Sequence, residues 1–544
     1  MVHGALKVSF RNSPAPTMRG SSLLLAIGAI AASAFGVQAQ TTTAFKYRTY
    51  SQIVDSILAL EAKYPQFVEV FTAQDRYGLP LRTELQCTRN GISEPCRHYV
   101  IKITDEASLP DPARPEVFFS GALHGDERVG PQTVTALAEL LVDHASRPDG
   151  NPWLKRLVRT RTIVIMPTTN AYGYDKNTRA ERSVDPNRDF NYAKGSTCFQ
   201  SMVARAVNEV WRDHLFQLSI TFHGGTQSIS YEWGSVNHEL SGGGSQKSPD
   251  HQGQFYMARA MSRFGGKFQD SVTYYPDGPM NDIVYAVNGG MEDWGYAASW
   301  ENAFTSPAPI GICQPTTYGG YAAEKSVYNN ATHRAFNILI ETSNSKQPSE
   351  AALGNSASLS DAALADYLPA SQTVGHVPRN IRAALLYIDV VQPYVQWITA
   401  PTTSKVGAAV PFSWEVLGAF TVDSTQLKIS KTPDFANAEM TVSQSGVTRW
   451  YHPDMQTSSA TNKGVFSHSA TFLEPGVYYV QAIATVDQDW QKQGTGSNLP
   501  APNVKPQTHV VNARTNPNWS FSHNGRIVKG QLEWASPVTT VVIA

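Results

Sequence analysis

The chain has 544 residues with 44 Lys and Arg against 45 Asp and Glu, a formal net charge of −1, and 41% hydrophobic residues. That length is enough for about two to four domains that each bury a core, and the balanced charge excludes the basic surface typical of nucleic-acid-binding proteins. The 4 cysteines are too few for a scaffold built on disulfides, so the composition indicates a large, folded, nearly neutral protein.

The N-terminal region has the pattern of a secretory signal. Arg19 precedes an apolar stretch of about 13 residues, Leu23–Phe35, and Val37-Gln38-Ala39 forms a small-x-Ala cleavage site before Gln40. A helix needs about 20 apolar residues to cross a bilayer, so this stretch indicates a removable signal rather than a transmembrane anchor. We expect residues 1–39 to be the signal, with Met18 as an alternative start, and the mature protein to be secreted.

An oxidising compartment allows the cysteines to form disulfides. Cys87 and Cys96 are near enough in sequence to close a local loop, which would leave Cys198 and Cys313 to pair. Four cysteines can pair in three ways, and the sequence alone does not choose between them.

Helices and apolar strands alternate through the first two thirds of the chain. Apolar residues at helical spacing predict helices over residues 48–64, 132–144, 202–216 and 379–391. Short apolar runs predict buried strands over residues 116–120, 162–166, 218–222 and 337–340, the last at the end of helical spacing that begins at Val327. Such alternation is typical of an α/β fold with a mixed, mainly parallel central sheet flanked by helices on both faces.

The pattern changes after a Ser-, Ala-, Asn- and Pro-rich stretch over residues 344–374, which predicts a loop. Helical spacing ends near residue 391, and short strands separated by turn residues are predicted over residues 394–399, 410–415, 426–430, 476–485 and 509–512. This pattern is typical of an all-β sandwich of the immunoglobulin or fibronectin kind. We therefore expect an α/β domain over residues 40–395 and a β-sandwich domain over residues 396–544.

Metal-ligand side chains follow two of the predicted strands. His124 and Glu127 lie in a glycine-rich segment just after residues 116–120, and His223 directly follows residues 218–222 and precedes two glycines. Ligands bind at the carboxyl ends of strands in an open α/β sheet, and two histidines with one glutamate form an open zinc site that leaves a position for water. Taken singly, the His-Glu pair also fits a surface loop, and His223 a hydrogen-bonded core histidine.

Two further segments bear on the same edge of the sheet. Glu341 directly follows residues 337–340, where a carboxylate can take a proton from a zinc-bound water, although a solvated strand end is the plain alternative. In Asp185-Pro-Asn187-Arg188, the arginine and asparagine suit a planar carboxylate. Asp185 fits an acid that orients a zinc-bound imidazole, although the segment is also good turn chemistry.

These motifs, in this order, resemble the zinc metallocarboxypeptidases of the carboxypeptidase A/B and N/E type over roughly residues 48–395. Phe-His-Gly-Gly at 222–225 and Gly-Gly-Met-Glu-Asp-Trp at 289–294 are more similar to the N/E branch. The resemblance implies one Zn²⁺ per chain, held by His124, Glu127 and His223. It further implies that Asp185 orients His124 and that Glu341 is the catalytic glutamate.

The resemblance also implies how a substrate is held. Asn187 and Arg188 match the residues that bind the terminal carboxylate, and Tyr285 matches the tyrosine that closes over the substrate. Both Arg179 and Arg182 lie where the family has the arginine that stabilises the oxyanion, and we favour Arg179.

The position of the family's specificity-pocket floor is occupied by Glu292. An acid there favours a basic C-terminal side chain, although the N/E branch has an uncharged polar residue at this position. A salt bridge of Glu292 within the protein is the alternative.

The resemblance as a whole implies a zinc carboxypeptidase that acts on the C-termini of peptides or proteins, and the N-terminal signal predicts that it is secreted. Because the first helix begins near Tyr50, soon after the signal, we expect activity without removal of an inhibitory pro-segment. The alternatives are a zinc amidohydrolase of the same fold acting on peptidoglycan or γ-glutamyl amides, an inactive binding homologue, and a role carried by an adhesive or glycan-binding β domain. Neither the oligomeric state nor a ligand of the β domain follows from the sequence.

Overall fold

We describe the protein from a computed structural model. The described residues are 8–10 and 42–544, apart from residues 110, 112–113, 195, 270–271, 299–300, 302–312, 327–334, 365–371, 420, 436–437, 439–442, 449–463, 488–507, 510–518, 521–524 and 529–530. Of the expected signal, residues 1–39, only residues 8–10 are described, so the apolar stretch and the cleavage site lie outside the described part. Within the described residues, no helix has the length and apolar character needed to cross a membrane.

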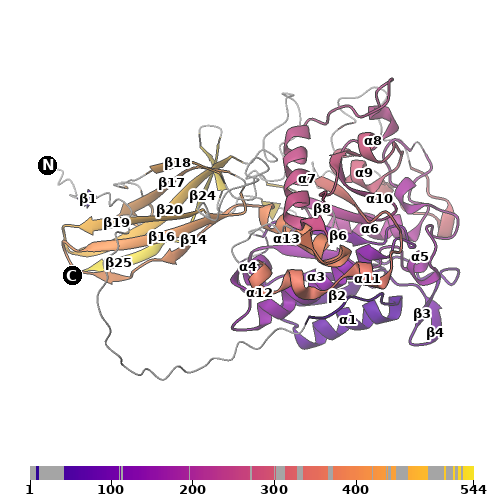
Figure 1. The fold of residues 1–544 in the computed structure, drawn as a ribbon, viewed down its shortest axis with the longest axis horizontal. Helices are drawn as coiled ribbons and strands as arrows, with labels where there is room; N and C mark the ends of the chain where they lie inside the picture. Colours follow the sequence, from indigo (N-terminus) through magenta and orange to yellow (C-terminus); the bar gives the residue numbers. More distant parts are fainter. Residues whose placement is uncertain are drawn as a thin grey trace.

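An eight-stranded mixed sheet forms the centre of the α/β part (Figure 1). Its four middle strands are parallel and its outer strands include antiparallel pairs, so the predicted fold class is confirmed. Across the sheet the strands are β11 (Asp277–Pro279), β9 (Gln227–Tyr231), β12 (Phe336–Thr342), β8 (Phe216–His223), β6 (Glu116–Gly121), β7 (Thr162–Met166), β5 (Tyr99–Ile103) and β2 (Val68–Thr72).

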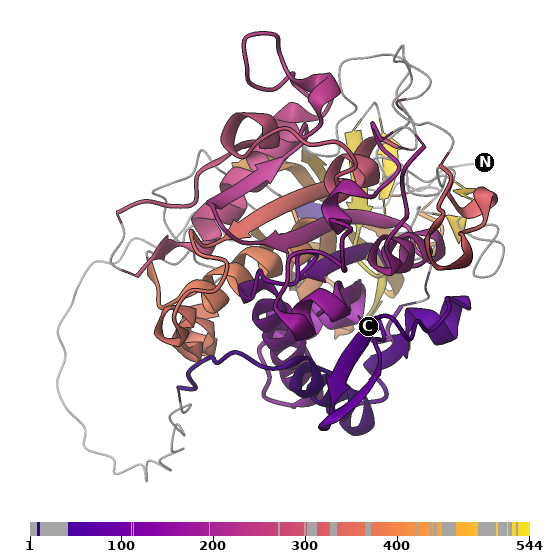
Figure 2. The ribbon, with the colours of Figure 1, turned by 90° about the vertical axis from the view of Figure 1, so that its right-hand side faces the viewer.

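Helices cover both faces of this sheet. Its middle strands are therefore buried along their whole length. On one face, Gly130 of α3 lies against Phe222 of β8, and α3 also contacts α1, α4 and α13. On the other face, Trp211 of α6 contacts Phe118 of β6 and Trp294 of α9, with ring centroids 5.8 and 5.3 Å apart. Figure 2 shows the sheet between these helices.

The helices of the α/β part are α1 (Tyr50–Lys63), α2 (Ala73–Tyr77), α3 (Val129–Ser146), α4 (Pro152–Thr160), α5 (Ala171–Lys176), α6 (Met202–Asp213), α7 (His251–Gly265), α8 (Met280–Ile283), α9 (Met291–Ala297), α10 (Ala323–Ser326), α11 (Glu350–Leu353), α12 (Asp361–Leu364) and α13 (His376–Val390).

Most predicted elements are present, with shifts at their ends. The helix expected over residues 202–216 ends at Asp213, because Phe216 is already the first residue of β8. The helix expected from Arg379 begins at His376, since Pro378 lies in its first turn, where a missing N–H costs no hydrogen bond. The stretch expected as a loop over residues 344–374 contains the short helices α11 and α12, whereas the helical spacing expected from Val327 lies largely outside the described residues.

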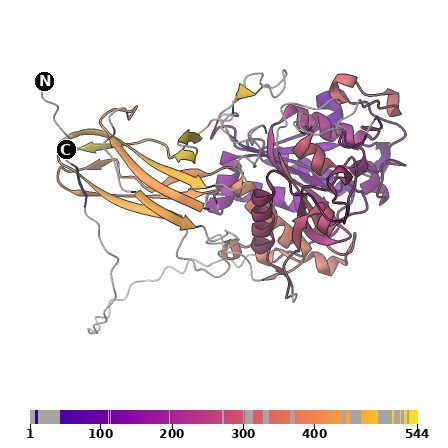
Figure 3. The same cartoon turned by 90° about the horizontal axis from the view of Figure 1, so that it is seen from above.

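The C-terminal part consists of two β-sheets that share one hydrophobic cluster (Figure 3). Alternation places Val410, Phe412, Trp414 and Val416 of β16 inside, facing residues such as Val480 of β20. One sheet contains β1 (Val8–Phe10), β19 (Val465–Phe472), β16 (Ala409–Leu417) and β14 (Tyr394–Thr399). The other contains β15 (Thr403–Ser404), β25 (Thr539–Ile543), β20 (Gly476–Asp487), β17 (Thr421–Ser430) and β18 (Ser443–Thr448), with β24 (Gln531–Ala535) beside β20 and β23 (Gly525–Val528) beside β24.

The structure contains two disulfides, one within a small local loop and one between residues far apart in the sequence. Cys87 in β3 (Gln86–Arg89) is bonded to Cys96, which directly follows β4 (Ile92–Pro95), and Cys198 is bonded to Cys313. Of the three pairings that the sequence allows, the structure therefore contains the one that closes the small loop.

Candidate metal centre

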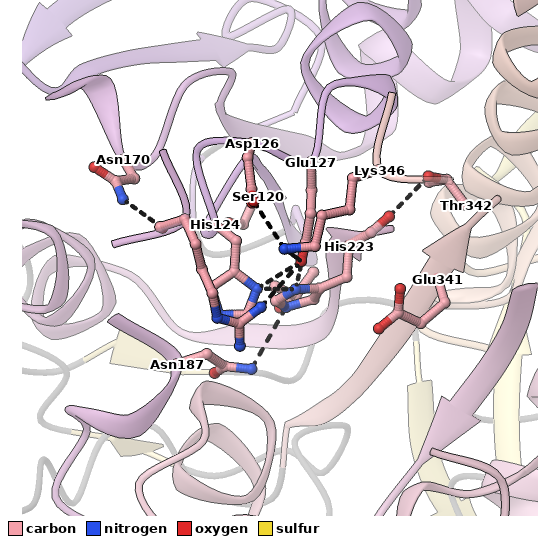
Figure 4. Close-up of polar contacts among 12 residues, drawn as sticks. Ser120, His124, Asp126, Glu127, Asn170, Asn187, His223, Glu341, Thr342 and Lys346 are labelled. Atoms are coloured by element: carbon pink, nitrogen blue, oxygen red, sulfur yellow. Dashed lines mark hydrogen bonds and ion pairs between the residues drawn. The ribbon is translucent and has the colours of Figure 1, made fainter. Parts of the chain in front are cut away.

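His124, Glu127 and His223 meet at the carboxyl ends of two neighbouring parallel strands, β6 and β8. The Nδ1 atom of His223 lies 3.1 Å from His124 Nδ1 and 2.8 Å from Glu127 Oε2, and His124 Nδ1 lies 2.9 Å from Glu127 Oε1. Figure 4 shows the three side chains pointing toward one another. All three are buried, so their metal-ligating atoms form one enclosed cluster.

The donor set suits zinc. Two imidazole nitrogens and one carboxylate leave a fourth position open for water, which is the arrangement of catalytic rather than structural zinc sites. Within the described ranges this is the only group of three or more His, Cys, Asp or Glu side chains whose ligand atoms converge, all within 4.8 Å of one another. Burial acts to raise the pKa of Glu127, but the two adjacent histidines outweigh burial and lower the pKa of this carboxyl group.

The loop that presents His124 and Glu127 is fixed by close backbone packing. The backbone N–H of Gly125 donates to the Arg179 carbonyl, at 3.2 Å. A Cβ atom at Gly125 would lie 2.0 Å from the carbonyl carbon of Gly173 in α5, so only glycine fits between the two ligands.

Asp185 and Arg179 lie behind the metal ligands. His124 Nε2 lies 3.0 Å from Asp185 Oδ1, while Arg179 Nε donates to Asp185 Oδ2 at 3.0 Å and Arg179 Nη1 to Glu127 Oε1 at 3.3 Å. Burial acts to raise the pKa of Asp185, but the hydrogen bond from His124 and the charges of His124 and Arg179 lower it well below its usual range. Asp185 is therefore an ionised acceptor that leaves Nδ1 of His124 facing Glu127.

The two candidate arginines lie in different surroundings. Arg179 contacts both Glu127 and Asp185, whereas Arg182 is exposed and adopts a positive φ of 54° at a turn. Only Arg179 is brought to the cluster.

Glu341 lies directly across from His223, because β12 and β8 are parallel neighbours that pair these two residues in register. Its side chain is 8% exposed, and its Oε2 accepts from the backbone N–H of Thr226 at 3.4 Å. Burial raises the pKa of Glu341, with the charge of His223 opposing it. A carboxylate with a raised pKa beside a metal cluster is suited to exchange protons.

Of the residues expected to bind the substrate, Asn187 and Glu292 contact His223, and Arg188 and Tyr285 lie beside each other. Asn187 is buried, and its Oδ1 accepts from the backbone N–H of Met291 at 2.8 Å. The Arg188 guanidinium lies 5.8 Å from the ring centroid of Tyr285, which is 55% exposed. Glu292 is buried on α9, with Oε2 accepting from Asn187 Nδ2 at 3.2 Å and Oε1 lying 3.5 Å from His223 Nε2.

Lys346 also contacts the cluster, and this contact was not predicted from the sequence. Lys346 Nζ lies 2.8 Å from Asp126 Oδ2 and 3.8 Å from Glu127 Oε1, as Figure 4 shows. Lys346 follows Glu341 by only five positions, which is the one signal in the sequence that could have pointed to it.

Comparison with known proteins found a family model that matches the segment containing His124, Glu127 and His223. Residues 94–309 match the family model described as zinc carboxypeptidase. Human carboxypeptidase D is 27% identical over 252 residues, covering 42% of this chain and 17% of that protein. The human carboxypeptidase N catalytic chain is 24% identical over 294 residues, covering 46% of this chain and 60% of that protein. The chain thus spans about a sixth of the length of the carboxypeptidase D relatives it matches.

A solved structure, thrombin activatable fibrinolysis inhibitor (TAFI), is 15% identical with a TM-score of 0.40, covering 63% of this chain and 73% of that chain.

Proposed function

We propose, from the match of residues 94–309 to the zinc carboxypeptidase family, that the chain is a zinc exopeptidase that hydrolyses the C-terminal peptide bond of peptides or proteins. The observation that supports this most is the convergence of His124, Glu127 and His223 beside Glu341, which faces His223 from the neighbouring strand. Zinc ligands and a proton acceptor at one sheet edge are what metal-assisted hydrolysis needs.

The position of each side chain supports the role that we propose for it. A bound Zn²⁺ would polarise the scissile carbonyl and lower the pKa of a coordinated water to about 7. Glu341 accepts the proton of the attacking water and returns it to the leaving amine, because its carboxylate lies beside His223 and its pKa is raised. The Arg179 guanidinium stabilises the developing oxyanion, and removal of one such donor costs about 3 kcal/mol.

The free carboxylate of the substrate makes the reaction an exopeptidase reaction. Arg188 offers a guanidinium, which pairs with carboxylates in a bidentate way, and the adjacent Asn187 carries a side-chain amide that Glu292 holds in place. Tyr285 is exposed next to Arg188 and is available to cover the bound C-terminus.

A preference for basic C-terminal side chains is a narrower part of the proposal. Glu292 is ionised, since burial acts to raise its pKa but His223 outweighs it. Burial raises the pKa of the neighbouring Asp293 and Glu232, so Glu292 is the group that carries the negative charge here. A negative charge at a pocket floor favours a cationic side chain over an apolar one.

Export from the cell completes the proposal. It is supported by the apolar stretch Leu23–Phe35, by the cleavage signal that follows it, and by disulfides of the kind that persist in oxidising compartments.

Replacing Glu341 by Gln tests the mechanism. The variant should lose turnover by at least about 100-fold, the lower end for a general base, while elemental analysis finds zinc at the wild-type ratio. Glu324→Gln, an exposed residue on α10, serves as the control and should retain activity. Near-normal turnover of Glu341→Gln would contradict the assignment.

The substrate class is tested with blocked peptides that end in Lys, Arg, Leu or Phe, each product being identified by mass spectrometry. Release of a single C-terminal residue, fastest from the Lys and Arg peptides, is the expected result. No release from any peptide by zinc-loaded protein would favour an amidohydrolase acting on another amide, and zinc-free protein as purified would favour an inert binding protein.

A further inference from the structure

The side-chain amide of Asn187 lies next to Nε2 of His223, the ring nitrogen that faces away from the cluster. When Nδ1 of His223 faces the metal position, the ring proton resides on Nε2, which must then donate a hydrogen bond. The amide nitrogen of Asn187 lies 3.5 Å from that Nε2, but it is itself a donor, because Asn187 Oδ1 is fixed by the backbone N–H of Met291. Asn187 cannot accept the proton of His223.

The acceptor at this place is Glu292. Its Oε1 lies 3.5 Å from His223 Nε2, and its Oε2 accepts from Asn187 Nδ2 at 3.2 Å. Glu292 and His223 are each 2% exposed, and Oε1 has no hydrogen-bond partner in the part of the chain that the structure describes. A fully buried carboxylate oxygen without a partner is costly, and the imidazole N–H is the group toward which it points.

The same arrangement occurs at the other histidine. His124 Nε2 lies 3.0 Å from Asp185 Oδ1, so each histidine of the cluster has a carboxylate on its outer nitrogen. Such carboxylates fix the tautomer and orientation of a zinc-bound imidazole and raise its basicity.

We propose that Glu292 is a positioning residue of the metal centre, which holds the Nε2 proton of His223 and thereby directs Nδ1 toward the metal. The proposal rests on the proposed function only in that it takes the metal to be zinc. This role is additional to the proposed effect of Glu292 on substrate preference. Metal affinity tells the two roles apart, because a residue that only contacts the substrate side chain leaves the metal affinity unchanged.

Zinc affinity, measured by competition with a chromogenic chelator, is the deciding readout. Glu292→Leu removes the acceptor and should weaken zinc binding by about 10–100-fold. Glu292→Gln keeps a neutral acceptor and should weaken it less. Asp185→Asn should lower the affinity through His124 in the same way. Asp293→Asn is the matched control, because Asp293 is buried on the same helix but accepts from the backbone of Gly234, and its affinity should remain that of the wild type.

Two further measurements separate the outcomes. The visible absorption of the Co²⁺-loaded protein should change in both Glu292 variants, because it reports ligand geometry, and should not change in Asp293→Asn. Wild-type zinc affinity and an unchanged cobalt spectrum in a folded Glu292→Gln variant would overturn the proposal, and so would a loss of Lys and Arg selectivity without a loss of affinity. If the wild type binds zinc but hydrolyses no peptide, the proposed function fails while the affinity comparison still decides the role of Glu292.

Discussion

Arg179 joins two acids of the metal centre through one planar group. Its Nε and Nη1 atoms reach Asp185 and Glu127 simultaneously, a geometry that the single ammonium of lysine cannot reproduce. Arg179→Lys should therefore lower kcat by about 100-fold, while Arg182→Lys, at an exposed turn, should leave kcat unchanged. Steady-state kinetics at matched zinc content is the measurement, and equal losses in the two variants would contradict the assignment.

Glu181 makes the stability of the fold depend on pH. It is buried and accepts from the backbone N–H groups of Met202 and Val203 at the start of α6. Burial raises its pKa from 4.5 to about 7, although these hydrogen bonds oppose the rise. The native state thus keeps a proton that the unfolded chain has released, so stability falls as the pH rises from about 4.5 to 7.

Urea unfolding of the wild type and of Glu181→Gln at pH 5 and pH 8 measures this effect. The wild type should lose roughly 3 kcal/mol relative to the variant across that range. Glu324→Gln should follow the wild type. If Glu181→Gln and the wild type lose the same stability, Glu181 titrates normally in the fold.

At the scale of elements, the loop between β6 and α3 depends on Gly125. A methyl group there would overlap Gly173 of α5, so Gly125→Ala must push apart the loop that holds His124 and Glu127. The variant should lose on the order of 3 kcal/mol of stability and bind zinc more weakly. Gly242→Ala, where a methyl group meets nothing within 4 Å, is the control. Thermal unfolding of the two variants is measured with and without zinc. If Gly125→Ala unfolds at the same temperature as the wild type under both conditions, α5 moves aside without a cost in stability.

Elements with continuous apolar sequence could be predicted, and those with mixed sequence could not. The strands at residues 116–120 and 162–166 are buried on both faces, so their sequences are almost wholly apolar. Strand β9 reads Gln-Ser-Ile-Ser-Tyr, and helix α7 begins His-Gln-Gly-Gln without a capping side chain. Both were missed, because their stability comes from packing against β12 and α13 rather than from local sequence.

The same limit applies to the site. His124 and Glu127 are three positions apart in the sequence and His223 ends an apolar strand, so their convergence follows from strand order. The contact between His223 and Glu292 depends on how α9 packs on the sheet, which no local pattern encodes.

At the scale of the whole molecule, buried apolar residues form two clusters, one within residues 50–391 and one within residues 395–543. We propose that these are two domains with a boundary near residue 395. Arg156 of α4 connects them, donating through Nη2 to Glu415 of β16 at 2.7 Å and through Nη1 to the Tyr394 hydroxyl at 3.1 Å.

We expect Arg156 and Glu415 to contribute jointly to the free energy of unfolding, because each side chain is only 12% exposed. A double-mutant cycle with Arg156→Met and Glu415→Gln should give a coupling free energy of about 1–2 kcal/mol. The exposed pair Arg147–Asp143 should give no more than about 0.5 kcal/mol. A coupling free energy near zero for the junction would mean that the two parts unfold independently of this contact.

The metal ligands are far apart along the chain, since His223 lies 99 positions after His124. No short fragment contains all three, so they meet only after β8 has paired with β6. Contacts of such long range form slowly, so the complete ligand set requires the assembled sheet. An ion that binds only the native state stabilises it by mass action, by about 2.7 kcal/mol when its concentration is 100 times the Kd. We therefore expect the midpoint of thermal unfolding to rise with the zinc concentration, independently of any effect of zinc on activity.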